Sequence, residues 1–160
     1  MTGLHPRGAA NAPRATARTA TTTVRGTRIG YGADGKGPLV VRTHGMTQSG
    51  RTDRDLDLID WRRLTEAGFR VVSYDARGHG SSDGTTDPDD YTWISLAEDL
   101  LALIDQLSPR EPVRAVGVSM GTGTVLTAMT MAPERFAAVA LGAPPIYPAP
   151  RPLPCSTSPH

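Results

Sequence analysis

The residue best suited to covalent chemistry is Ser119, in the sequence Gly-Val-Ser-Met-Gly over residues 117–121. The β-branched residues before it predict a strand, and apolar residues at helical spacing after it predict a helix. Gly117 and Gly121 lie two residues on either side of the serine, where the absence of Cβ atoms lets strand and helix approach closely. Such a turn exposes the serine hydroxyl, which becomes a nucleophile once a base accepts its proton.

Two further turns follow predicted strands. The apolar run 38–43 ends at His44, Gly45 and Met46, and the run 69–74 continues into Asp-Ala-Arg-Gly-His-Gly-Ser-Ser-Asp-Gly over residues 75–84. A lone His-Gly pair after a strand is typical of a turn with a hydrogen-bonded imidazole. In the second segment we interpret Asp75, Arg77 and His79 as residues that organise the loop through hydrogen bonds.

Alternating strands and helices must position these turns. Apolar stripes predict helices over 53–67, with Gly68 as C-cap, over 95–107, with a capping box at Ser95, and from the Ser119 turn to about Ala132. The four predicted buried strands are 38–43, 69–74, 113–118 and 136–141, preceded by two short antiparallel strands, 22–25 and 28–31. This alternation predicts an α/β fold with a parallel sheet and right-handed crossovers.

The three turn motifs, in this order, resemble the esterase-like and haloperoxidase-like branch of the α/β-hydrolase family. The resemblance implies a three-layer sandwich with a mostly parallel sheet and an incomplete hydrolase core over residues 21–143. Composition predicts a disordered leader (1–20) before it and an irregular proline-rich tail (144–160) after it. The resemblance also implies that Ser119 is the nucleophile and that the backbone amides of Met46 and Met120 stabilise the oxyanion. The implied substrate is a small ester or acyl compound, with no cofactor.

The family resemblance also implies that an acid and a histidine follow the serine. No Asp or Glu follows Glu134, and the only histidine after the serine is the terminal His160. The acid and base therefore remain unassigned, and we expect weak ester turnover. Two alternatives stay open: a non-catalytic or fragmentary hydrolase scaffold, and a dinucleotide-binding loop like that of short-chain dehydrogenases, formed by Gly117, Gly121 and Gly123.

The composition of the chain limits which classes of function and which compartments are possible. The 160 residues are 38% hydrophobic and 21% charged, with a net charge of +1, which argues against nucleic acid as a partner. No apolar run approaches the roughly 20 residues of a membrane helix. The single cysteine, Cys155, and the lack of metal-ligand spacing predict a cytoplasmic protein without a structural metal. Residues 136–141 carry no charge or proline, so we expect an unprotected sheet edge and self-association through it.

Overall fold

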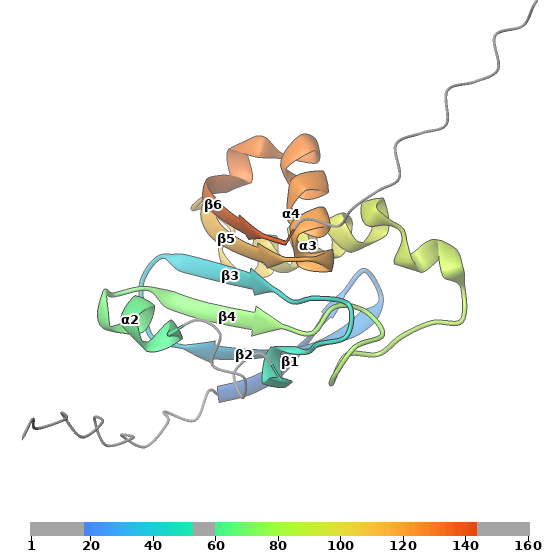
Figure 1. Ribbon diagram of the computed structural model, residues 1–160, viewed down its shortest axis with the longest axis horizontal. Helices are drawn as coiled ribbons and strands as arrows, with labels where there is room; N and C mark the ends of the chain where they lie inside the picture. The colour runs from blue at the N-terminus through green and yellow to red at the C-terminus, as the bar shows by residue number, and fades with distance from the viewer. Residues whose placement is uncertain (1–17, 53–59, 144–160) are drawn as a thin grey trace, which may run out of the picture.

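The computed structural model describes residues 18–52 and 60–143, which form a six-stranded mixed sheet (Figure 1). The strand order is β1-β2-β4-β3-β5-β6. Strands β1, β2 and β4 pair antiparallel, whereas β4, β3, β5 and β6 run parallel, so the predicted α/β fold is confirmed. The strands are β1 (Arg18–Val24), β2 (Thr27–Asp34), β3 (Leu39–Thr43), β4 (Arg70–Tyr74), β5 (Val113–Val118) and β6 (Phe136–Gly142).

The first hairpin is longer than predicted. Strand β1 pairs with β2 as far as Arg18, opposite Ala33, so three residues of the expected leader belong to the sheet. The hairpin turns at Arg25 and Gly26, whose φ angles of 47° and 79° are both positive, as a two-residue type I′ turn requires. Most β1 side chains are exposed. The strand is therefore defined by its backbone pairing with β2, and its sequence shows no apolar periodicity that would reveal it. Residues 1–17 lie outside the described residues.

The described helical elements are α2 (Trp61–Glu66), α3 (Trp93–Leu107) and α4 (Met120–Met131), with short 3-10 turns η1 (Pro88–Tyr91) and η2 (Pro133–Arg135). Helix α3 begins two residues before the predicted capping box at Ser95. The cap is Thr92, whose Oγ1 accepts a hydrogen bond from the Ser95 amide at 3.2 Å. Part of the predicted helix 53–67 lies outside the described residues, and α2 forms its end. No helix in the described part of the chain is long and apolar enough to cross a membrane.

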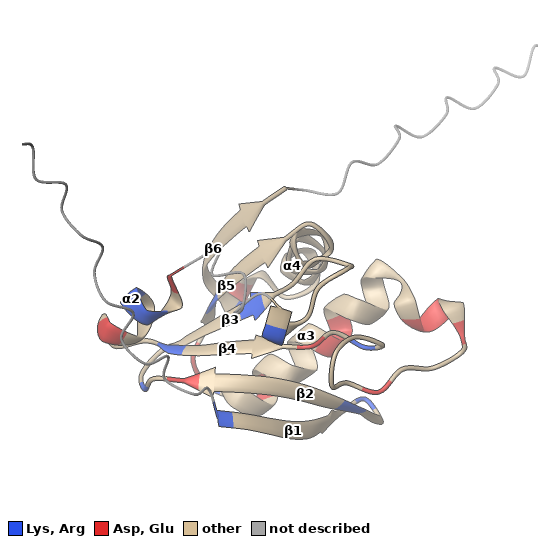
Figure 2. Cartoon of the chain, turned by 60° about the horizontal axis from the view of Figure 1, so that its bottom comes forward, with Lys and Arg blue, Asp and Glu red and all other residues tan. Residues whose placement is uncertain are grey.

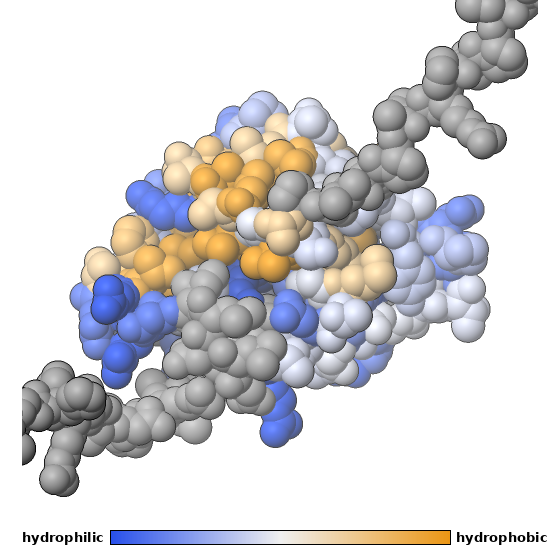
Figure 3. Space-filling model, in the orientation of Figure 1, coloured by the Kyte–Doolittle hydropathy of each residue, from blue (hydrophilic) through white to orange (hydrophobic). Residues whose placement is uncertain are grey.

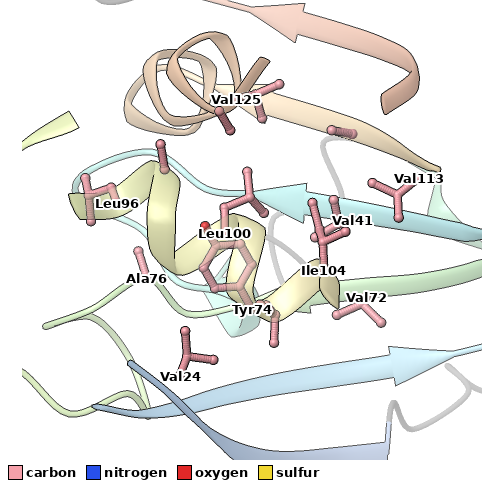
Figure 4. Packing of buried hydrophobic residues seen from close by; sticks show 14 of the residues in the cluster. Val24, Val41, Val72, Tyr74, Ala76, Leu96, Leu100, Ile104, Val113 and Val125 are labelled. Carbon is pink, nitrogen blue, oxygen red and sulfur yellow. The ribbon is translucent and has the colours of Figure 1, made fainter. Parts of the chain in front are cut away.

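The main core lies between the sheet and the pair α3 and α4 (Figure 4). Side chains from both helices and from one face of the sheet fill it, among them Val41, Val72, Leu100, Ile104, Val113 and Val125. On the opposite face, the Arg42 guanidinium lies 4.8 Å from the ring centre of Trp61, at the start of α2. Because Val41 and Arg42 are consecutive, they point to opposite faces of β3. Helix α2 therefore covers the other face, which makes the predicted third layer.

Strand β6 ends the sheet within the described residues, because its only recorded strand partner there is β5. Val139 packs against the core, while the neighbouring Ala138 and Ala140 are exposed, as is Leu141 at 38%. Apolar side chains gather where Figure 1 draws β5 and β6 (Figure 3). Neither β6 nor α4 carries a charged residue (Figure 2).

This edge leads to the first prediction. We expect the chain to self-associate through β6, since among residues 18–52 and 60–143 this uncharged strand pairs on one side only, and such an edge can pair with a second copy. Replacing Ala140 by lysine places a charge on the exposed face, and light scattering after size-exclusion chromatography should show a shift towards monomer. Ala67→Lys, an exposed position after α2, is the matched control. A monodisperse wild-type monomer at the highest soluble concentration would contradict the prediction.

Candidate functional site

Ser119 occupies a strained backbone conformation between β5 and α4. Its φ of 52° and ψ of −113° lie in a region that L-residues with a Cβ rarely adopt. Such a residue costs of order 1–3 kcal/mol and persists only where the surroundings enforce it. Here the Ser119 amide donates to the Gly142 carbonyl of β6 at 3.1 Å, and the Ser119 carbonyl accepts from the Gly123 amide at 3.2 Å. The two bonds hold the serine between a strand and the first turn of a helix.

The flanking glycines are required by close backbone contacts. A Cβ on Gly117 would lie 2.8 Å from the Gly121 carbonyl oxygen. A Cβ on Gly121 would lie 2.6 Å from the carbonyl carbon of Thr43, at the end of β3. Real Cβ atoms do not approach backbone this closely, so these positions admit only glycine without a shift of the elements. Helix α4 therefore sits directly on β5 and on the end of β3.

The turn that follows β3 lies beside Ser119. A Cβ built on Gly45 would be 3.7 Å from the Ser119 Cβ, so the backbone at residue 45 passes within contact distance of the serine. The turn is closed by the Gln48 amide, which donates to the Gly45 carbonyl at 3.0 Å. The packing of α4 on β3 thus brings residues from two separate strand ends to one place.

Two backbone amides at this place have no acceptor among residues 18–52 and 60–143. They belong to Met46, in the turn after β3, and to Met120, the first residue of α4. The amides of the first helical turn have no partner within the helix and point out of its N-terminus. An N–H at such a position can donate to negative charge that develops on a ligand. The Met46 side chain is 65% exposed, whereas that of Met120 is buried.

No histidine or carboxylate of the described chain hydrogen bonds with the Ser119 hydroxyl. The ring of His44 is buried and uses both nitrogens, Nδ1 with the Gly45 carbonyl at 2.7 Å and Nε2 with the Ala76 amide at 2.9 Å. The nitrogens of His79 face the carbonyl oxygens of Arg77 and Met46 at 2.9 and 2.8 Å. Both imidazoles therefore bond to backbone groups of the turns after β3 and β4, and His160 lies outside the described residues.

The loop after β4 is organised by the carboxylate of Asp75. This buried carboxylate accepts from the Gly50 amide at 2.6 Å and from both the amide and the hydroxyl of Ser81 at 2.8 Å. A Cβ on Gly80 would lie 2.8 Å from Oδ1 of the same carboxylate and closer still to Oδ2, and the φ of Gly80 is 51°. The interpretation of Asp75 as a loop-organising residue is confirmed. These contacts tie the loop to the segment that follows the Met46 turn.

Arg77 anchors the same loop to α3. Its guanidinium forms two parallel bonds to the Asp99 carboxylate, from Nε at 2.9 Å and from an Nη at 2.8 Å, and both side chains are buried. Arg25 contacts the same carboxylate at 2.9 Å. The hydrogen bond to Asp99 raises the pKa of Arg77 above its ordinary value. Burial, and then the charge of Asp99, raises the pKa of Tyr74, so this phenol stays neutral.

A separate cavity of about 440 Å³ opens beside the Asp75 loop, away from Ser119. Its lining includes Tyr31, Ser49, Arg51 and Asp75 but neither Ser119 nor the two methionines. The Asp75 oxygens on its wall already accept the bonds described above. Within the described residues, no group of three His, Cys, Asp or Glu side chains gathers as a metal site.

Comparison with known proteins identifies the family of this arrangement. A family model described as the alpha/beta hydrolase fold matches residues 38–157, three quarters of the chain. The chain belongs to the α/β-hydrolase family. This confirms the resemblance drawn from the three motifs. It makes the dinucleotide-loop alternative wrong, and packing explains the glycines on which that alternative rested: a Cβ on Gly123 would meet the Trp93 ring at 2.5 Å.

Similar sequences include an epoxide hydrolase from Caballeronia sordidicola, 34% identical over 109 residues that cover 66% of this chain and 30% of that protein. A protein named as a non-heme haloperoxidase, from Mycobacterium phage D29, is 33% identical over 116 residues, 72% of this chain and 39% of the relative. The chain thus spans about a third of the length of these relatives.

Solved structures give the same picture. An epoxide hydrolase from Vigna radiata has a TM-score of 0.75 and 26% identity, over 86% of this chain and 43% of that structure. Epoxide Hydrolase A from Mycobacterium thermoresistibile has a TM-score of 0.71 and 29% identity, over 79% of this chain and 39% of that structure. The described sheet and helices therefore correspond to part of a larger hydrolase fold.

Sequence reasoning missed Asp99 in this member of the α/β-hydrolase family. The carboxylate lies on α3 between Leu96 and Leu103, within the apolar stripe that predicted the helix. An acid at a core-facing helical position is itself a signal, because buried carboxylates require a partner. The acid at position 99 therefore predicts an ion pair, but the sequence of the helix does not indicate that Arg77 is the partner. Thr122 carried no such signal, although its hydroxyl oxygen lies 2.9 and 2.7 Å from the carbonyl oxygens of Gly117 and Gly142.

Proposed function

We propose that this α/β-hydrolase chain carries the nucleophile and oxyanion-binding groups of a serine hydrolase that cleaves an ester or related acyl bond. The observation that carries the proposal is the meeting of three groups: Ser119 at φ 52°, the Met46 amide and the Met120 amide, neither amide having an acceptor in the described chain. In the proposed reaction, Ser119 Oγ attacks the carbonyl carbon and forms an acyl-serine. The two amides stabilise the oxyanion, and each such donor contributes about 2.7–4 kcal/mol where it has been measured.

Several relatives are named epoxide hydrolases. The serine at position 119, however, favours acyl transfer over the opening of an epoxide. A serine oxygen that opened an epoxide would form an ether, and water does not readily hydrolyse an ether to regenerate the serine. Attack on an acyl carbon forms an ester, which water does hydrolyse. Ser119 is therefore suited to turnover on acyl substrates. The base and acid of this reaction are unassigned, and a non-catalytic scaffold remains the alternative outcome.

The second prediction tests the nucleophile with an activated fluorophosphonate. Ser119 Oγ should attack phosphorus and displace fluoride, giving one label per chain, while Ser119→Ala should give none. We expect slow labelling, because no base contacts the serine within residues 18–52 and 60–143. Ser108→Ala removes a serine hydroxyl at the end of α3, bonded to the Glu111 carbonyl, and should leave labelling unchanged. Equal labelling of wild type and Ser119→Ala by mass spectrometry would refute the proposal.

A further inference from the structure

The Met46 turn is held by its backbone instead of its side chain. The Met46 side chain is 65% exposed and cannot anchor the turn by packing. The peptide groups on both sides of Met46 are, however, hydrogen bonded through their carbonyl oxygens. The preceding group accepts from the Gln48 amide at 3.0 Å and lies 2.7 Å from His44 Nδ1, and the following group lies 2.8 Å from His79 Nε2.

His44 fixes the peptide group that contains the Met46 N–H. The Ala76 amide donates to Nε2 of His44 at 2.9 Å, so in the neutral ring the proton is on Nδ1. Nδ1 then donates to the Gly45 carbonyl, which shares its peptide plane with the Met46 N–H. This bond orients the plane. It also polarises the amide, since hydrogen bonds in a chain strengthen one another.

His79 fixes the next peptide group. Its Nε2 faces the Met46 carbonyl at 2.8 Å, and its Nδ1 faces the Arg77 carbonyl of its own loop at 2.9 Å. The positioning role requires the tautomer with the proton on Nε2, which donates to the nearer of the two oxygens. That loop is rigid, because Asp75 and the buried Arg77 tie it to the segment at Gly50 and to α3. With both flanking peptide planes held, the two soft backbone dihedrals of Met46 are set. The two imidazole centres lie 5.1 Å apart, on either side of one residue.

We propose that His79 is a positioning residue for the oxyanion-binding amide of Met46, acting through its Nε2 bond to the Met46 carbonyl, with His44 holding the preceding peptide group. The inference rests on the proposed function and deepens it. It assigns the histidine of the 75–84 loop to the nucleophile site, although that loop begins at a different strand. His79 does not touch the substrate in this role.

A matched pair of amide variants tests the role. Glutamine places an amide nitrogen near the position of Nε2 and can still donate to the Met46 carbonyl. Asparagine places it near Nδ1, so it keeps only the contact to the Arg77 carbonyl. His79→Asn should lower the maximal fluorophosphonate inactivation rate about tenfold, the loss expected for about one hydrogen bond that orients a donor. The apparent affinity for the probe should stay within about twofold, and His79→Gln should restore most of the rate.

The Met46 amide itself supplies a second readout. In ¹⁵N-labelled protein, His79→Asn should shift the Met46 amide resonance and lower its order parameter, while His79→Gln should leave both near wild type. Thr85→Val, which removes a hydroxyl bonded to Asp90 in the same loop, is the control and should change neither readout. Thermal unfolding followed by circular dichroism checks that all variants fold.

Equal inactivation rates and unmoved Met46 resonances in both His79 variants would overturn the positioning role. Absence of Ser119-dependent labelling in wild type would instead refute the proposed function, and the Met46 resonance would still decide the role of His79. A loss of affinity with an unchanged maximal rate would also count against the inference, because it would place His79 in probe binding.

Discussion

Replacing Asp99 by alanine is expected to lower the free energy of unfolding by about 3–5 kcal/mol, the cost of removing one partner of a buried ion pair. Of the carboxylates in the described chain, the buried Arg77 then keeps only that of Asp90, 3.5 Å from its guanidinium. The carboxylate is 2% exposed and Arg77 is 4% exposed, so water cannot take over the lost bonds. Their two parallel bonds at 2.8 and 2.9 Å join α3 to the loop after β4. Since a domain has only about 5–15 kcal/mol of stability, the variant loses a large fraction of it. Urea unfolding at neutral pH measures the change.

Asp105→Ala is the matched control, because it removes the same group from the same helix. The Asp105 side chain is 68% exposed and pairs with Arg135 at 3.0 Å. The Arg135 side chain is only 17% exposed, but it keeps its bond to the Ser108 carbonyl at 2.8 Å when Asp105 is removed. A pair with one exposed partner contributes about 0–1 kcal/mol, so this variant should remain close to wild type. Replacing Asp99 and Arg77 together by leucine and methionine should cost less than Asp99→Ala alone, since no charge stays buried. If Asp99→Ala and Asp105→Ala lowered the free energy of unfolding equally, the buried pair would contribute no more to stability than the pair of Asp105 with Arg135.

The parallel strands could be predicted from sequence to within one residue at their starts, while the antiparallel hairpin could not. The runs 38–43, 69–74 and 113–118 are short, rich in β-branched residues and bounded by turn residues. Their composition alone therefore predicts buried strands. The hairpin is rich in threonine and glycine, and its predicted strands fall short of Arg18–Val24 and Thr27–Asp34. Its turn is formed by Arg25 and Gly26, not by the Asn-Gly or Asp-Gly pair that is the usual sequence signal of a type I′ hairpin.

The candidate site also has a part that could be predicted from sequence and a part that could not. The turn at Ser119 was predictable because two glycines around a serine, between a strand pattern and a helix pattern, mark a tight turn in the sequence itself. The contacts that hold the site are long-range: His79 and Met46 are 33 residues apart, and Asp99 and Arg25 are 74 residues apart. They depend on the strand order β2-β4-β3-β5, which places the ends of β3, β4 and β5 together. No local pattern encodes that order, so the two histidines could be read only as members of their own turns.

Gly121→Ala is expected to destabilise the fold by about 3 kcal/mol, the upper end for an overpacked site, and to slow fluorophosphonate labelling of Ser119 roughly a hundredfold. The new methyl group would lie 2.6 Å from the Thr43 carbonyl carbon and even closer to its oxygen, and this neighbour is backbone that cannot rotate away. Helix α4 must therefore move off the end of β3. Ser119 moves with the helix and Gly45 stays with β3, so the serine separates from the Met46 amide. Urea unfolding and the labelling rate measure the two effects.

Two comparisons isolate the clash as the cause. Alanine has a higher helix propensity than glycine by about 1 kcal/mol, so without a clash Gly121→Ala would stabilise α4. Gly142→Ala places the same methyl group near the same turn, where the nearest atom in the described part of the chain, the Gly117 carbonyl oxygen, is 4.0 Å away. That variant should keep its stability within about 0.5 kcal/mol and label at the wild-type rate. A Gly121→Ala protein that is more stable than wild type, or that labels as fast as Gly142→Ala, would mean that α4 does not seat on Thr43 and that the two turns do not form one site.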